Sequence, residues 1–132
     1  MKYLLLIYSN SPERWEHPIF LRTPEFQALP EDERAELVER AEALHREIVE
    51  SGEFVVGTAL ADPALTRTAR PRDGVPAITD GPYVEAKEQL AGYFVIDCDS
   101  PERAAEIAAG FPDARFGAVE IRPVMDVVGQ EM

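Results

Sequence analysis

The stretch of sequence that decides the fold is EDERAELVERAEALHREIVESGEFVVGTAL, residues 31–60, in which a helical pattern is followed at once by a strand pattern. At about 100° per residue, the apolar side chains of the first part share one face of a helix: Leu37, Val38, Ala41, Leu44, Ile48 and Val49. Three acids stand in the first turn, where the helix dipole favours negative charge, and Gly52 suits a left-handed C-cap. The sequence therefore predicts a helix over residues 31–51 and a strand over residues 54–60, in which Gly57 marks a bulge or a close backbone approach.

Apolar segments on both sides of this stretch predict three more strands and a second helix. Residues 3–8 (YLLLIY) are apolar at every position, so this strand is expected to be central, with both of its faces covered. Residues 93–98 form another apolar strand, and Ser100-Pro101 begins a helix that runs to about Ala109. The last strand is expected over residues 118–124.

Two segments lie outside this framework. Asp73-Gly74 is a typical hairpin turn that joins residues 66–72 to residues 75–79, and the prolines on both sides of the turn confine this ribbon to a sheet edge. Residues 9–29 mix three prolines with large apolar side chains, and are expected to fold over the core as a lid, with a short helix after Thr23-Pro24.

The order strand, helix, strand, ribbon, strand, helix, strand predicts an α+β fold in a single domain over residues 1–132. We expect a ferredoxin-like sandwich of the dimeric α/β-barrel type with an inserted β-hairpin. Two helices can cover only one face of such a sheet, and the first strand is apolar on both sides. A homodimer that pairs through the open sheet face is therefore expected. The alternative is a monomer in which the lid and the ribbon cover that face.

Composition narrows the classes of partner. Thirteen basic and twenty-five acidic residues give a net charge of −12, which repels phosphate backbones and anionic lipid surfaces. Nucleic-acid binding and membrane binding are therefore not expected. Cys98 is the only cysteine and stands in an apolar run, which predicts a buried thiol and fits a reducing cytoplasm.

No metal and no organic cofactor is expected. The two histidines, His17 and His45, have no zinc-binding spacing, and the sequence holds no phosphate-binding glycine loop or dinucleotide fingerprint. A small-molecule ligand is the remaining expectation for a site.

The segment DGPYVEAKE, residues 80–88, concentrates the candidate catalytic groups. Asp80 is followed by a glycine and a proline that fix the direction of its carboxylate, as suits a general base. The alternative is that Asp80 only accepts hydrogen bonds from its own turn. Glu85, Lys87 and Glu88 add two acids and a cation, enough for an acid/base pair or for a carboxylate tuned by a neighbouring ammonium group. The alternative is a surface loop whose charges neutralise one another.

Two further candidates lie elsewhere. His45 falls within the apolar stripe of the first helix, which predicts either a catalytic imidazole that meets Asp80 or Glu88 across the sheet, or a hydrogen-bonded core histidine. Arg70 stands in the ribbon between Arg67 and Arg72, where three cations either hold an anionic ligand or protect an edge strand. We assign substrate contacts to Tyr83, Glu85, Lys87 and Arg70.

Residues 80–88 closely resemble the DGPFAETKE signature of the YCII-related family, and depart from it at Tyr83, Val84 and Ala86. The flanking segments 1–3, 89–93 and 120–124 are also similar to this DGPF-motif branch. The resemblance implies a ferredoxin-like fold, a dimer that pairs its sheets and pockets near the DGP turn. Some members are proposed to use a His-Asp pair, and the helix position of that histidine is Ala41 in this chain.

Three hypotheses for function follow. The first is a cofactor-free lyase or isomerase in which Asp80 or Glu88 moves a proton on an oxygenated substrate. The second is a non-enzymatic ligand-binding or regulatory module, since relatives with this motif lie beside alternative sigma factors or stress systems. The third is an accessory dimer in which the motif stabilises a turn and an interface.

Overall fold

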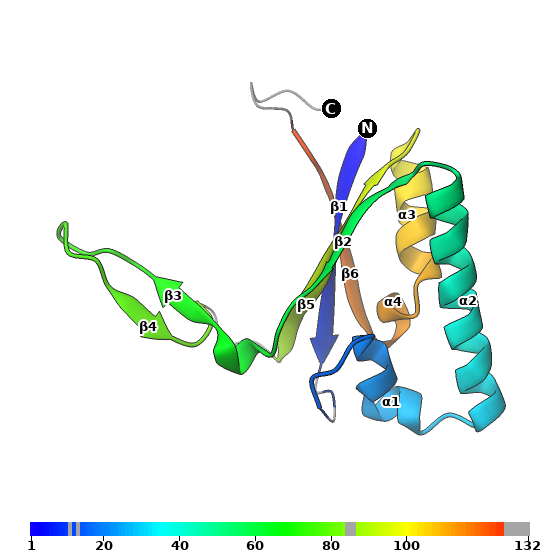
Figure 1. Ribbon diagram of the computed structural model, residues 1–132, viewed down its shortest axis with the longest axis horizontal. Coiled ribbons are helices and arrows are strands. Elements are labelled where there is room, and N and C mark those ends of the chain that lie inside the picture. Colours follow the sequence, from blue (N-terminus) through cyan, green and yellow to red (C-terminus); the bar gives the residue numbers. More distant parts are fainter. Residues whose placement is uncertain (11, 13, 84–86, 126–132) are drawn as a thin grey trace.

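The computed structural model describes residues 1–10, 12, 14–83 and 87–125. It has an α+β fold with a four-stranded antiparallel sheet and a separate two-stranded ribbon. The sheet strands are β1 (Lys2–Asn10), β2 (Phe54–Ala59), β5 (Glu88–Asp97) and β6 (Gly117–Pro123), in the order β2-β5-β1-β6. This order is consistent with the expected ferredoxin-like sandwich. Figure 1 shows the helices on one side of the sheet only.

The two long helices follow the predicted pattern closely. They are α2 (Glu31–Glu50) and α3 (Pro101–Gly110), and Ser100 caps α3 by accepting a hydrogen bond from the Arg103 N–H at 3.1 Å. The predicted stripe of α2 is corrected at its end, because Val49 is 49% exposed while Ile48 is fully buried. The helix rolls on the sheet so that Ile48, with Leu44 one turn earlier, makes the contact.

The first strand departs from the expectation that both of its faces are covered. Along β1, Tyr3, Leu5 and Ile7 are buried under the helices, while Leu4 and Leu6 on the opposite face remain half-buried. The helices cover one face only, as expected of two helices, so within the described residues the other face awaits the cover expected from a second copy. We call the other side of the sheet the open face.

The lid lies on the helix side of the sheet. Its elements are η1 (Ile19–Arg22) and α1 (Pro24–Gln27), with Thr23 capping α1 as predicted. Phe20 and Phe26 pack against Phe116 of the short helix α4 (Asp113–Phe116), with ring centroids 5.4–6.4 Å apart. The lid therefore extends the core and, over the described ranges of the chain, does not cover the open face.

The ribbon is the expected hairpin, formed by β3 (Arg67–Ala69) and β4 (Ile78–Asp80). Asp73 and Gly74 both have positive φ, 51° and 74°, as a type I′ turn requires. We call residues 63–83, which include the turn η2 (Pro63–Leu65), the arm. Figure 1 shows the arm projecting from the end of β2 on the side of the sheet opposite the helices.

Strand β5 is longer than predicted. It begins at Glu88 instead of Tyr93, and its added residues pair with the second half of β1. Cys98 follows β5 and is buried, as predicted, and burial raises the pKa of its thiol. Within the ranges that the structure describes, no helix is both long and apolar enough to cross a membrane.

Candidate functional site

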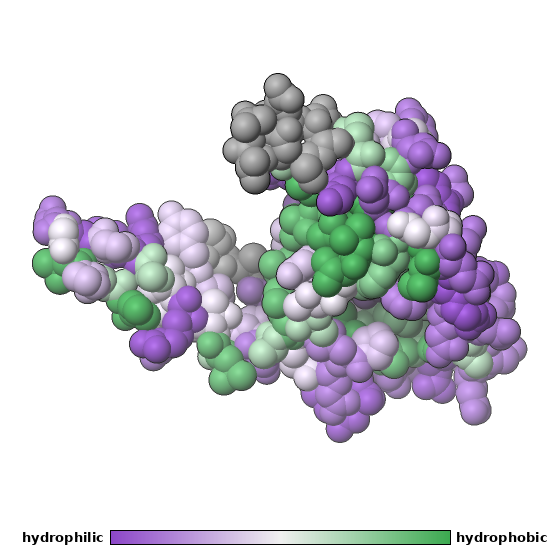
Figure 2. Space-filling view, turned by 45° about the horizontal axis from the view of Figure 1, so that its top comes forward, coloured by the Kyte–Doolittle hydropathy of each residue, from purple (hydrophilic) through white to green (hydrophobic). Residues whose placement is uncertain are grey.

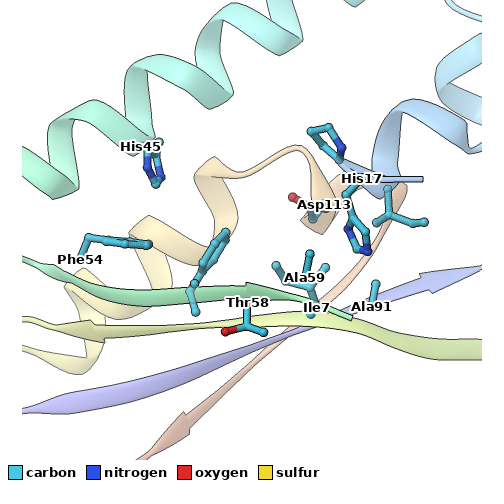
Figure 3. A pocket seen from close by; sticks show the side chains of 13 residues that line it. Ile7, His17, His45, Phe54, Thr58, Ala59, Ala91 and Asp113 are labelled. Atoms are coloured by element: carbon cyan, nitrogen blue, oxygen red, sulfur yellow. The ribbon is translucent and has the colours of Figure 1, made fainter. Parts of the chain in front are cut away.

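A cavity of about 290 Å³ lies between the sheet, α2 and the residues before η1. Most of its wall is apolar and comes from three strands and the lid, while its ionisable groups come from three separate elements. Its lining residues are Ile7, His17, Pro18, Ile19, His45, Phe54, Gly57, Thr58, Ala59, Ala91, Gly92, Phe94 and Asp113. Figure 3 shows His17 and Asp113 on one side of this space and His45 on α2 across from them.

Two glycines that line the cavity, Gly57 and Gly92, allow close packing of strands β2 and β5. A Cβ atom at Gly57 would stand 2.6 Å from the Phe94 ring, and one at Gly92 would stand 2.6 Å from the Thr58 carbonyl oxygen. The close neighbour of Gly57 is thus a side chain and not another backbone, and the bulge of β2 lies between Phe54 and Val56. Larger side chains at these positions would force the two strands or the Phe94 ring to shift.

His17 is held at the rim by a hydrogen bond to the backbone. Its Nε2 lies 2.7 Å from the Leu60 carbonyl oxygen, which also accepts from Trp15 Nε1 at 2.9 Å. A carbonyl oxygen can only accept, so the bond requires the proton on Nε2. In a neutral ring, Nδ1 is then the nitrogen that can accept a proton.

Asp113, the first residue of α4, is the partly buried acid of the cavity. Burial raises the pKa of its carboxyl to about 6, although its own backbone N–H and the electrostatic effect of the nearby His17 act in the opposite direction. Among the residues described, no hydrogen bond or ion pair joins Asp113 to His17. A carboxyl group with this pKa can give or take a proton near neutral pH.

His45 marks the opposite side. Its ring meets the edge of Phe54, with centroids 4.9 Å apart, and the residue as a whole is exposed. The core-histidine alternative is therefore wrong. A second hollow of about 400 Å³ shares Pro18, His45, Phe94 and Asp113 with the first, so His45 and Asp113 stand where the two hollows meet.

The other predicted site residues lie outside this cavity. The Asp80 side chain is 98% exposed on β4, where its nearest cation is Arg67 at 3.9 Å. Arg70 lies over the Tyr83 ring, 4.8 Å from its centroid, and both belong to the arm. Within one chain the structure does not bring Asp80 to His45, because the arm and α2 lie on opposite sides of the sheet (Figure 1).

The remaining candidates lie near the start of β5. Lys87 and Glu88 line a polar hollow of about 460 Å³ on the open face, together with Tyr8 and Glu120. Glu85 falls outside the described residues. A hollow of about 370 Å³ lies at the base of the arm and includes Pro82, so a pocket does adjoin the DGP turn.

Sequence reasoning named His45 but did not connect it with His17 or Asp113. His17 was considered only as a metal ligand, and no sequence pattern singled out Asp113. Among the described residues no group of acids, histidines and cysteines is arranged to hold a metal ion. His17 and Asp113 share one local sequence feature: each lies next to a proline and close to buried apolar residues. This feature is too common to predict a site by itself.

Comparison with known proteins agrees with the resemblance to the YCII-related family. An uncharacterized protein of Rhizobium meliloti (strain 1021) is 34% identical to this chain over 96 residues, which cover 71% of this chain and 76% of that protein. Residues 1–128 match the YCII-related domain. The match spans the sheet, both long helices and the arm, and so the chain belongs to the family of proteins with a YCII-related domain.

Proposed function

We propose that this protein binds a small oxygenated molecule in the cavity between His17, His45 and Asp113 and moves a proton on it, as a cofactor-free isomerase or lyase. The observation that carries the proposal is the partly buried Asp113 carboxyl, whose pKa is raised to about 6 beside an imidazole fixed by Leu60. Buried acids with shifted pKa values in a concave site are typical of general acid–base catalysis. The catalytic carboxyl is thus moved from Asp80, which is exposed, to Asp113.

The chemistry needs no co-reactant. Ionised Asp113, or His17 Nδ1, removes a proton from a carbon next to a carbonyl group, and a protonated imidazole stabilises the oxygen as an enol forms. In an isomerisation the same proton returns to a different carbon. In an elimination a carbon–oxygen bond breaks instead and the leaving oxygen takes the proton. The apolar wall from Ile7, Phe54 and Phe94 suits a compact carbon skeleton.

The test is a thermal-shift screen against small carboxylic, phenolic and lactone compounds, with wild type, Asp113→Asn, His17→Gln and Asp80→Asn. A ligand at a hundred times its dissociation constant should stabilise the fold by roughly 2.7 kcal/mol. We expect shifts that are lost in Asp113→Asn and His17→Gln and kept in Asp80→Asn. Shifts that disappear only in Asp80→Asn would return the site to the DGP turn.

Compounds that bind are then incubated in deuterium oxide with each variant. Proton abstraction predicts enzyme-dependent exchange of carbon-bound hydrogen, seen by NMR, in wild type and not in Asp113→Asn. Binding without exchange or turnover would favour the alternative, a non-enzymatic ligand-binding or regulatory module in a sigma-factor or stress system. The exposed Arg70–Tyr83 pair on the arm supports a docking role of that kind.

We also propose the finer assignments that the resemblance implies. The motif at residues 80–88 supports the DGPF-motif branch, and the strand order β2-β5-β1-β6 supports a ferredoxin-like sandwich. A cytoplasmic location is supported by the lone, buried Cys98. A homodimer through the open face is supported by its apolar rows. Cross-strand partners share a face, so Leu4 lies beside Val95 and Leu6 beside Tyr93, all half-buried.

A further inference from the structure

We propose that the arm of one chain lies across the open face of a second copy and seats its arginines in the hollow between Glu88 and Glu120. The inference rests on the proposed homodimer and adds to it a named contact. Its parts are the exposed arm, the apolar open face and the distribution of charge between them.

The apolar surface of the arm is left largely exposed by the residues that the structure describes. Strands β3 and β4 pair only with each other among the described strands, and an isolated two-stranded hairpin is at best marginally stable in water. Even so it exposes large apolar side chains: Leu65 at 74%, Val75 at 62%, Ile78 at 57% and Tyr83 at 67%. A hairpin of this kind is expected to be covered in the working assembly.

The open face provides a matching surface. Strand pairing places Leu4, Val95 and Val56 in one row across three strands, and Val56 is 42% exposed. Tyr8 and Leu90 form another row nearer the arm, where Leu90 is 36% exposed. Figure 2 shows apolar residues gathered in the middle of the body's visible face, and single apolar residues among polar ones along the arm.

The position of the arm favours a second copy of this chain as the partner that covers the open face. Since the arm projects on the side of the sheet that lacks helices (Figure 1), a body resting on the open face would lie against the arm as well. Under two-fold symmetry each chain would then offer one arm and receive one. The same two surfaces are used twice, as an isologous interface requires.

The distribution of charge indicates which part of the open face receives the arm. Residues 63–83 hold three arginines and two aspartates, a net charge of +1, in a chain whose total is −12, so the rest carries −13. The open-face hollow of about 460 Å³ has Glu88 and Glu120 in its wall, against a single cation, Lys87. Tyr8 adds a hydroxyl group, which lies 3.5 Å from Glu120 Oε2. Arginine guanidinium groups fit carboxylate pairs of this kind.

The experiment is a charge swap followed by analytical ultracentrifugation of the full chain. Arg70→Glu with Arg72→Glu is expected to weaken the dimer at least about tenfold, because like charges would then face each other. Adding Glu88→Arg and Glu120→Arg to the same chain is expected to restore most of the affinity. The control, Arg14→Glu with Arg40→Glu, makes the same change of charge at exposed sites on the lid and α2 and should leave the dimer intact.

A photo-cross-linking residue at Val75 provides a second measurement that does not depend on weakening the dimer. We expect covalent dimers from this position and none from the same residue at Val49, which is exposed on α2. A wild type that stays monomeric at high concentration would overturn both the dimer and the arm contact. A wild-type dimer that neither responds to the arm variants nor cross-links at Val75 would overturn the arm contact alone.

Discussion

In the body of this chain, β1 and β5 press one row of side chains against α2 and α3, whereas in the arm β3 and β4 have only each other. Tyr3 and Ile96 are almost completely buried, while Ile78 of the arm is 57% exposed. Both regions show strand-like sequence, so local pattern alone does not reveal which strands acquire a cover. The body holds the buried core and the candidate site, and the arm is where we propose that a second copy binds.

The largest effect is expected from removing a core side chain. Ile96→Ala should lower the free energy of unfolding by about 2–5 kcal/mol, because Ile96 is fully buried in the main core and its neighbours cannot close the gap. Ile78→Ala is the matched change in the arm and should cost less than about 0.5 kcal/mol. Urea unfolding at concentrations low enough for a monomer measures both. Equal costs would show that the arm belongs to the same cooperative core.

A stabilising change is expected at the candidate site. Since the folded chain raises the Asp113 pKa to about 6, it holds that proton more tightly than the unfolded chain, and stability falls as pH rises from about 4 to 6. Asp113→Asn removes this penalty and should stabilise the protein by roughly 1–3 kcal/mol at pH 7.5, with little effect at pH 4. Asp80→Asn, in the arm, should show no such difference. Thermal unfolding at the two pH values decides it, and a destabilised Asp113→Asn at pH 7.5 would argue for a structural carboxylate.

An ion pair of the body should contribute more to the free energy of unfolding than an ion pair of the arm. In the body, Arg103 donates to both oxygens of Glu53 at 2.8 and 2.9 Å, and this lowers the Glu53 pKa to about 2. Arg103→Gln should therefore cost about 1–2 kcal/mol at pH 7, an effect present above the unfolded pKa near 4.3 and lost as pH falls toward 2. In the arm, Arg67→Gln should change almost nothing, because the Arg67–Asp80 pair is exposed. A cost for Arg103→Gln that persists unchanged at pH 2 would assign the effect to packing.

Sequence alone predicted the elements whose signals are local. Helix α2 follows from the spacing of Leu44 and Ile48, α3 from Ser100-Pro101, and the arm turn from Asp73-Gly74. The early start of β5 was missed because Glu88 and Gln89 are polar and do not mark a strand. One open sheet face was predicted, but not which side of β1 it takes, because Leu4 and Leu6 are as apolar as the buried Tyr3 and Leu5.

The candidate site was harder to predict because it is assembled from distant segments. His45 was found through its place on the apolar face of a helix, and the structure puts it at the rim of the cavity. The burial of Asp113 results from the packing of the lid and β1 around α4, which no pattern near residue 113 reports. The acids of residues 80–88 drew attention by clustering in sequence, yet Asp80 is exposed and Glu88 lies on the open face.

The smallest effect on the body is expected from the tip of the arm. Gly74 has φ 74°, and alanine in this left-handed region is disfavoured by roughly 1–2 kcal/mol, so Gly74→Ala should loosen the turn. The bridge between Arg72 and Val75, with hydrogen bonds of 3.0 and 2.8 Å, should then exchange its amide hydrogens faster. The amides of β5 should keep their protection, because no core contact of the body involves this turn. Hydrogen exchange resolved by residue tests this. Faster exchange in β5 as well would mean that the arm and the body unfold together. The arm would then not be an independent hairpin, which is a premise of the proposed contact between the arm and a second copy.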